Sequence, residues 1–155
     1  MNDTLPPITD ILPHRGTMLW QDTLIAHDDQ RATCRYQVPS TAWFADAQGA
    51  MPAWLGIEIM AQAIAAHVAM KAIRRGLPPK PGALLGSRDF TSRLPAFPAG
   101  SVLLTHVEME FRDESGLGAY QCSIQLGDDE IATAKLKVFE PDDFNQFLAS
   151  GSTPT

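Results

Sequence analysis

The chain has 155 residues, of which 45% are hydrophobic and 19% are charged, as is usual for one soluble globular domain. Its net charge of −6 at neutral pH argues against a general nucleic-acid-binding protein, and we expect no nucleic-acid partner. The first twelve residues lack the basic start and the apolar run of a secretory signal, so we expect a cytoplasmic location.

The N-terminal part of the chain predicts a short helical turn followed by two strands. The turn ends before Pro13, because proline disfavours helical geometry in the residue that precedes it. The strands are expected at Met18–Ala26 and Ala32–Val38, on either side of the polar turn His27–Arg31. A loop at Ser40–Met51 then leads into the longest predicted element.

That element is a helix at Pro52–Arg75. Its segment Trp54–Met70 is almost wholly apolar, and a helix that is apolar all round is buried rather than half-exposed. A helix of this length could span a membrane. Because Glu58 and Gln62 lie inside it, we expect instead a central core helix and no membrane partner. A glycine and two nearby prolines end the helix.

The C-terminal half predicts four more strands, at Ala83–Thr91, Val102–Phe111, Ala119–Leu126 and Ile131–Phe139. Short polar turns join the last three, which is typical of an antiparallel meander. A short helix at Pro141–Leu148 would complete a single domain of residues 1–149, and residues 150–155 are expected to form a disordered tail. The predicted fold class is α+β, with the long central helix wrapped by a curved antiparallel sheet of about six strands.

Three segments carry a family resemblance: LPHRG at Leu12–Gly16, MPAWLGIEIMAQA at Met51–Ala63, and KPGALLGSRDFTSRLPAFPAG at Lys80–Gly100. With the order of predicted elements, they resemble the hot-dog-fold β-hydroxyacyl-acyl-carrier-protein dehydratases over the stretch Ile8–Phe139. A narrower resemblance is to the dehydratase-like subunit encoded with aryl-polyene pigment synthases. The resemblance implies a hot-dog fold and the dehydration of β-hydroxyacyl thioesters in fatty-acid- or polyene-type synthesis. The acyl chain would be carried on the phosphopantetheine of an acyl carrier protein.

The resemblance also implies a catalytic site at the start of the long helix. Glu58 stands where the family has its acidic residue, and a buried position would favour the protonated form that a catalytic acid needs. The backbone N–H of Ala53 would stabilise the thioester oxygen. The family's catalytic histidine is absent, because the family spacing places it at Phe44, in a loop that reads WFADAQGAMPAW.

Three replacements for that histidine are open. Asp46 lies in the altered loop and could form a carboxylate pair with Glu58. His14 could be brought in by folding, although the family offers no precedent, or a second polypeptide could supply a histidine. The resemblance implies that hot-dog subunits pair and share their sites, so we expect a homodimer or a heterodimer with a related hot-dog subunit. The alternatives to catalysis are a structural acid at position 58, a loop cap at Asp46 and a structural hydrogen bond at His14.

Ala53, Trp54 and Gln62 are the candidate substrate-binding residues around Glu58. Gln62 lies one helical turn from Glu58, so the two side chains are on the same face and could form a hydrogen bond. Trp54 would either line a tunnel for the acyl chain or pack in the core.

Basic residues are concentrated after the middle of the chain. Half of the 12 basic residues lie between Lys71 and Arg93, where the sequence has one acidic residue. Such a surface suits an acidic carrier protein, and the candidate docking residues are Lys71, Arg74, Arg75 and Arg88. The alternative is a solvated helix end with scattered charges on a strand.

Other residues that often carry chemistry are expected to be structural. Cys34 and Cys122 lack the spacing of a redox or metal motif and lie in strand-like segments, which predicts reduced, packed thiols. His67 is expected to pack within the helix. No pair of residues has metal-ligand spacing, so we expect neither a metal nor another cofactor.

Two further functions stay open from the sequence. The first is a hot-dog thioesterase, because DAQG at Asp46–Gly49 is similar to the Asp-x-x-Gly of that branch, where a carboxylate activates water or attacks the thioester. The second is a non-catalytic subunit that binds acyl chains or supports a partner. A shared fold cannot choose among these functions.

Overall fold

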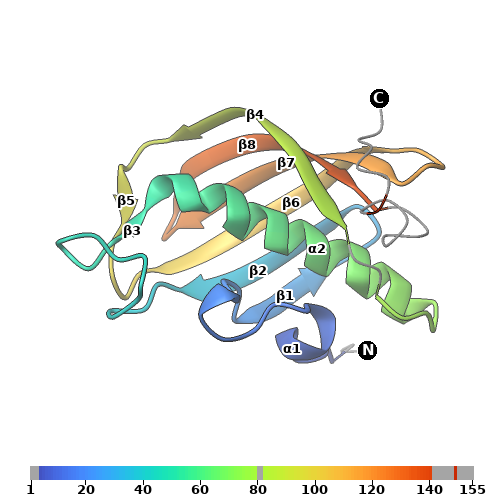
Figure 1. Ribbon diagram of the computed structural model, residues 1–155, viewed down its shortest axis with the longest axis horizontal. Helices are drawn as coiled ribbons and strands as arrows, with labels where there is room; N and C mark the ends of the chain where they lie inside the picture. The colour runs from blue at the N-terminus through green and yellow to red at the C-terminus, as the bar shows by residue number, and fades with distance from the viewer. Residues whose placement is uncertain (1–3, 80–81, 141–148, 150–155) are drawn as a thin grey trace.

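The computed structural model describes residues 4–79, 82–140 and 149, and shows one long helix lying across an antiparallel sheet (Figure 1). The helix, α2, spans Gly56–Arg74. The six strands of the sheet follow the order β1 (Thr23–His27), β2 (Arg31–Gln37), β6 (Val102–Arg112), β7 (Leu117–Leu126), β8 (Asp129–Phe139) and β4 (Ala83–Ser92). The predicted α+β fold class, a long helix wrapped by a curved six-stranded sheet, is confirmed. The helix predicted at Pro141–Leu148 and the tail at residues 150–155 lie outside the described residues.

The N-terminal segment folds along α2 before the sheet begins (Figure 1). It contains the predicted helical turn, α1 (Ile8–Ile11), and a 3₁₀ turn, η1 (Gly16–Met18). The predicted strand at Met18–Ala26 therefore starts late, at Thr23. The reason is tertiary, because the Trp20 N–H donates to a side chain of α2 instead of to a neighbouring strand.

The start of the long helix also differs from the prediction. The helix begins at Gly56 and not at Pro52, because the preceding residues have other backbone partners. A two-residue strand, β3 (Met51–Pro52), pairs with β5 (Ala96–Phe97), and a 3₁₀ turn, η2 (Ala53–Leu55), follows. The pairing of β3 with β5 holds the start of the helix in place against the sheet.

One side of α2 packs against the inner face of the sheet. The helix residues at this contact are completely buried, namely Ile59, Met60, Ala63 and Ala66. The start of the helix comes so close to β7 that a Cβ on Gly56 would lie 3.2 Å from Ile124 Cδ1. Burying each large apolar side chain of such a core stabilises the fold by roughly 1.5–3 kcal/mol. The helix is therefore held in one rotation about its axis.

The stretch Ala53–Arg74 is long and apolar enough to cross a membrane by length and composition, and is the one such helix in the described part of the chain. In the folded protein, 67% of its most apolar window is buried by the rest of the domain. That burial agrees with the prediction of a core helix.

Strand β4 forms one edge of the sheet. It pairs with β8 on one side, and no described strand pairs with its other side. Its register shifts between Leu84 and Gly86 and again between Arg88 and Thr91. Within the second shift, Asp89 has a φ of +55°. At the first shift, the side chain of Leu84 is 41% exposed. β4 is thus an irregular edge strand with exposed backbone and apolar side chains.

Both cysteines are packed thiols, as predicted. Cys34 and Cys122 are free and completely buried, on β2 and β7. Burial raises the pKa of each thiol to about 12, so neither forms a reactive thiolate at neutral pH.

His67 is completely buried, also as predicted. Its Nδ1 lies 2.9 Å from the Tyr120 hydroxyl, and its Nε2 lies 3.1 Å from the carbonyl oxygen of Asp28. Because a carbonyl oxygen can only accept, Nε2 carries the proton and Nδ1 accepts from the hydroxyl. Burial, with the His27 ring beside it, lowers the pKa of His67 to about 4. The imidazole is therefore neutral in the folded protein at neutral pH.

We expect the free energy of unfolding to fall as the pH is lowered from about 6.5 to about 4. Across this window the unfolded chain binds a proton at position 67 that the folded protein still excludes, so folding becomes less favourable by about 3 kcal/mol. Urea unfolding at a series of pH values measures the slope. His67→Gln should flatten it; the wild-type slope in this variant would contradict the assignment.

Candidate functional site

Glu58 lies in the first turn of α2, on a side of the helix that the sheet does not cover. Its side chain is 40% exposed, so the expectation of a buried Glu58 is wrong for the single chain. The helix keeps a stripe of half-buried and exposed residues at helical spacing, namely Trp54, Glu58, Ala61, Ala65, Val68 and Ala72. Trp54 is 68% exposed, which makes it available to a substrate or a partner and not part of the core.

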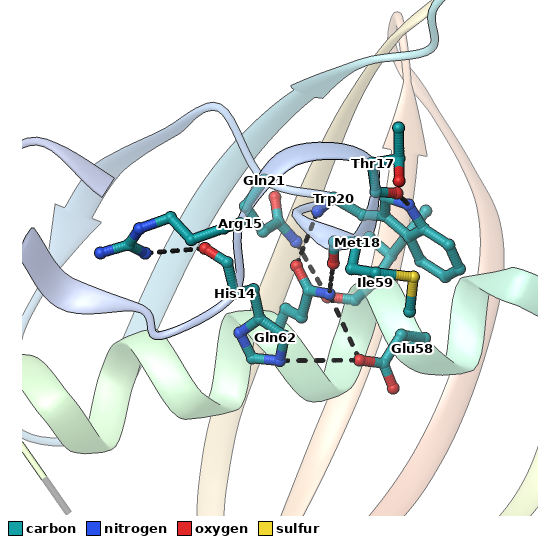
Figure 2. A network of polar contacts seen from close by, with 9 residues as sticks. All are labelled: His14, Arg15, Thr17, Met18, Trp20, Gln21, Glu58, Ile59 and Gln62. Carbon is teal, nitrogen blue, oxygen red and sulfur yellow. Dashed lines mark hydrogen bonds and ion pairs between the residues drawn. The ribbon is translucent and has the colours of Figure 1, made fainter. Parts of the chain in front are cut away.

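A hydrogen-bond network joins Glu58 to the N-terminal segment (Figure 2). Gln62 Nε2 donates to Glu58 Oε1 at 3.2 Å, as the helical spacing predicted, and to the carbonyl oxygen of Met18 at 2.9 Å. Gln62 Oε1 accepts the Trp20 N–H at 2.8 Å. A second amide, that of Gln21, donates to the Ile59 carbonyl oxygen at 2.8 Å. Two buried side-chain amides thus connect this segment to α2.

His14 comes from the loop between α1 and η1 and reaches the same carboxylate. Its Nε2 lies 3.9 Å from Glu58 Oε1, and its side chain is 29% exposed (Figure 2). The next residue, Arg15, donates from its guanidinium to the carbonyl oxygens of Thr9, Leu12 and His14 itself. Arg15 therefore holds the loop in the shape that turns His14 toward α2. Of the two replacements within the chain, the structure brings His14 to Glu58.

A cavity of about 180 Å³ opens beside Glu58, between α2 and the β4 edge of the sheet. Its polar side chains are those of His14, Glu58, Gln62 and Glu140. The remaining wall includes the apolar residues Ala61, Ala65, Val68, Leu84, Val138 and Phe139. An apolar groove with a few polar groups at one place is typical of a site for a small apolar ligand.

Two predicted site residues have other partners. Asp46 Oδ1 accepts the N–H groups of Gln48 and Ala50, both at 2.9 Å, and so caps its own loop. Within residues 4–79 and 82–140, no contact joins Asp46 to Glu58. The Ala53 N–H donates to the Pro95 carbonyl oxygen at 3.0 Å beside the β3–β5 pair, so the expectation of a free donor there is wrong in this structure.

The loop before the helix is filled by aromatic packing. Phe44, at the position of the family histidine, lies edge-on to Trp20 with ring centroids 5.5 Å apart, and edge-on to Trp43 at 5.7 Å. The indole N–H groups of Trp20 and Trp43 both donate to the Thr17 carbonyl oxygen, at 2.9 and 3.3 Å. An apolar ring at position 44 therefore packs where the resemblance to the hot-dog dehydratases implies a histidine.

The predicted docking residues lie on two elements of the fold. Lys71 and Arg74 lie in the last turn of α2. Arg75 follows at the C-terminal end of α2. Arg88 lies on β4, at one edge of the sheet. The four residues therefore come from the end of α2 and from β4.

Sequence reasoning missed the part that the N-terminal segment plays. Arg15 and Gln21 and the backbone of Met18 and Trp20 organise the site, yet nothing in their local pattern points to Glu58. The sequence feature that could have indicated this role is the LPHR motif. Its arginine, Arg15, donates hydrogen bonds to carbonyl oxygens of residues that precede it. Among the described residues, no group of three or more His, Cys, Asp or Glu side chains is placed to hold a metal ion.

The comparisons with known proteins agree on fold and family. The family model of the ApeP-like proteins, described as ApeP dehydratase, matches residues 6–149. A solved chain of the dehydratase heterocomplex ApeI:P from Xenorhabdus doucetiae is 26% identical with a TM-score of 0.87, over 96% of this chain and 100% of that chain. No curated protein matches the sequence.

More distant structures share the fold alone. Cj0977, a sigma28-regulated virulence protein from Campylobacter jejuni, has a TM-score of 0.60 at 17% identity, over 88% of each chain. A hypothetical thioesterase from Streptococcus pneumoniae, solved with coenzyme A, has a TM-score of 0.57 at 13% identity, over 76% of this chain and 84% of that one. The fold thus carries more than one chemistry, and the residues of the site must decide among them.

We expect Arg15→Met to destabilise the protein by about 1 kcal/mol, because three carbonyl groups lose a charged hydrogen-bond donor. Arg35→Met is the matched control, since its ion pair with Asp22, at 3.9 Å, is partly exposed. Urea unfolding of both variants measures the difference. An equal change in the two would show that Arg15 does not hold the loop.

Proposed function

Because the chain belongs to the ApeP-like dehydratase family, as its resemblance to the hot-dog dehydratases predicted, we propose that it is a dehydratase subunit for β-hydroxyacyl thioesters. The substrate is carried on an acyl carrier protein, in fatty-acid- or polyene-type synthesis. The subunit provides the carboxylate of the site and works with a related hot-dog subunit. The alternative is a thioesterase, which would share the fold. It would need Asp46 at the site, but Asp46 caps its own loop.

The proposed reaction needs three groups. A base removes the α-proton, an acid gives a proton to the leaving β-hydroxyl, and a donor stabilises the thioester oxygen. Glu58 suits the acid because it lies beside an apolar groove where its neighbours His14 and Gln62 hold it in place. Water and the enoyl thioester are the products.

The observation that carries the proposal is that the site is incomplete in one chain. Glu58 is 40% exposed on a stripe of small apolar residues, next to a sheet edge with no described partner strand. Excluding water from the groove would strengthen the electrostatic interactions of Glu58 with the reacting groups, so we expect the groove to be covered in the active enzyme. A second hot-dog subunit, pairing along β4 and α2, would cover the groove and bury Glu58.

The partner also supplies the missing base in this proposal. Phe44 occupies the family's histidine position in this chain, and its ring is packed against two tryptophans. The similar solved chain comes from a structure described as the dehydratase heterocomplex ApeI:P. This description supports a heterodimer here. His14 remains the candidate base within the chain, since its Nε2 is 3.9 Å from Glu58 Oε1.

We expect the purified chain alone to be slow or inactive on a β-hydroxyacyl carrier-protein thioester and to become active when a histidine-bearing hot-dog subunit is added. Glu58→Gln should then reduce turnover by about 10²-fold or more, because a carboxamide cannot exchange the proton. The matched control is Glu108→Gln, on the exposed outer part of β6. Enoyl thioester formation is the measurement.

Other outcomes of this assay identify the other functions. Turnover by the chain alone that His14→Gln abolishes would place the base in this chain. Release of free thiol in place of enoyl thioester would identify a thioesterase. Full turnover by the complex with Glu58→Gln would contradict the proposed role of the carboxylate.

The acidic carrier protein is proposed to dock at the C-terminal end of α2. Arg74→Glu with Arg75→Glu should raise the KM for the carrier-bound substrate by roughly tenfold, because reversed charges repel an acidic surface. The control pair is Lys135→Glu with Lys137→Glu on β8, which reverses the same number of charges on another surface. An unchanged KM in the helix variant, or an equal rise in both, would contradict docking at this end.

A further inference from the structure

Gln62 is a buried polar residue in an apolar helix. It is 1% exposed, and both polar atoms of its amide have hydrogen-bond partners. We propose that Gln62 is a positioning residue that holds Glu58 Oε1 as a hydrogen-bond acceptor, so that Glu58 exchanges its proton through Oε2. This inference rests on the proposed function, because it assigns the atom through which that reaction runs.

The backbone of the N-terminal segment fixes which way the Gln62 amide points. The Trp20 N–H can only donate, so the atom that faces it at 2.8 Å must be the amide oxygen. The other atom is then the NH₂ group, which has two hydrogens. One hydrogen goes to the Met18 carbonyl oxygen at 2.9 Å, and the second is left for Glu58 Oε1 at 3.2 Å. If the amide were flipped, its NH₂ group would face the Trp20 N–H, donor against donor. Its oxygen would face the Met18 carbonyl oxygen, acceptor against acceptor.

The two oxygens of Glu58 are therefore not equivalent. Oε1 receives the Gln62 N–H and lies 3.9 Å from His14 Nε2, whereas Oε2 has no hydrogen bond or ion pair with any residue that the structure describes. In Figure 2, the second oxygen of Glu58 points away from both His14 and Gln62. A proton on Oε1 would compete with the hydrogen that Gln62 donates. When Glu58 is protonated, its proton must sit on Oε2.

Among the residues that the structure describes, few titratable side chains line the cavity beside Glu58. Besides His14, the titratable side chain on the same cavity is Glu140, at the end of β8, which is paired with Arg112 at 3.4 Å. In the reaction, Oε2–H gives its proton to the β-hydroxyl, which leaves as water, while the base takes the α-proton. The protonated base then releases its proton to solvent, and the ionised Glu58 takes up a proton from solvent, which restores the starting state. Gln62 keeps its own hydrogens throughout.

The test is Gln62→Glu, which keeps the size and the acceptor for Trp20 but removes both donated hydrogens. We expect kcat of the assembled dehydratase to fall by about 10²-fold near pH 8, with KM little changed, because two adjacent carboxylates now repel. The loss should be smaller near pH 6, because a protonated carboxyl at position 62 again donates one hydrogen. Gln62→Met, which cannot donate at any pH, should lose the same factor at both pH values.

Gln121→Glu is the control, since Gln121 lies on the half-buried outer side of β7. Wild-type kcat in Gln62→Glu near pH 8, or an equal loss at both pH values, would overturn the inference; the second result is what a purely structural role gives. Urea unfolding of each variant, measured in parallel, shows that the fold is kept. Glu58→Gln is run beside them, because turnover that survives in that variant contradicts the proposed function and not the role of Gln62 alone.

Discussion

The packing of α2 against the inner face of the sheet is the constraint on which the rest of this structure depends. Completely buried residues such as Ile59 and Met60, and the close approach of Gly56 to β7, leave the helix one rotation about its axis. Once that rotation is set, the direction of every other side chain of α2 follows. Gln62 must face the N-terminal segment, and Glu58 must face the groove beside β4.

The polar side of the helix is satisfied by a segment far away in sequence. A buried amide without partners would cost about 1–3 kcal/mol, and Gln62 avoids this cost by bonding to the backbone of Met18 and Trp20. The same bonds delay the start of the first strand to Thr23 and keep the loop of His14 next to α2. Stability and the arrangement of the site therefore use the same contacts, which is why both depend on residues 12–21.

The candidate site has a carboxylate, Glu58, and an aromatic ring, Phe44, where the resemblance implies a histidine. Around Phe44, rings from Trp20 and Trp43 pack edge-on or tilted, and their indole N–H groups share one carbonyl oxygen. This loop is thus built as an apolar support for the N-terminal segment. A carboxylate at 40% exposure beside an uncovered groove is consistent with a subunit that completes its site by association.

The sequence by itself determined the fold class and most of the elements, because alternation in strands and the apolar run of the helix are local patterns. The five strands from Ala32 onward, the packed His67 and both packed thiols follow from such patterns. Residue spacing also found the pair of Glu58 and Gln62. Only the tertiary structure decided that His14 reaches Glu58, that Asp46 caps its own loop and that Ala53 has a backbone partner. These contacts join residues whose closeness in space depends on how the chain folds, and the exposure of Glu58 depends on which surfaces the sheet leaves uncovered.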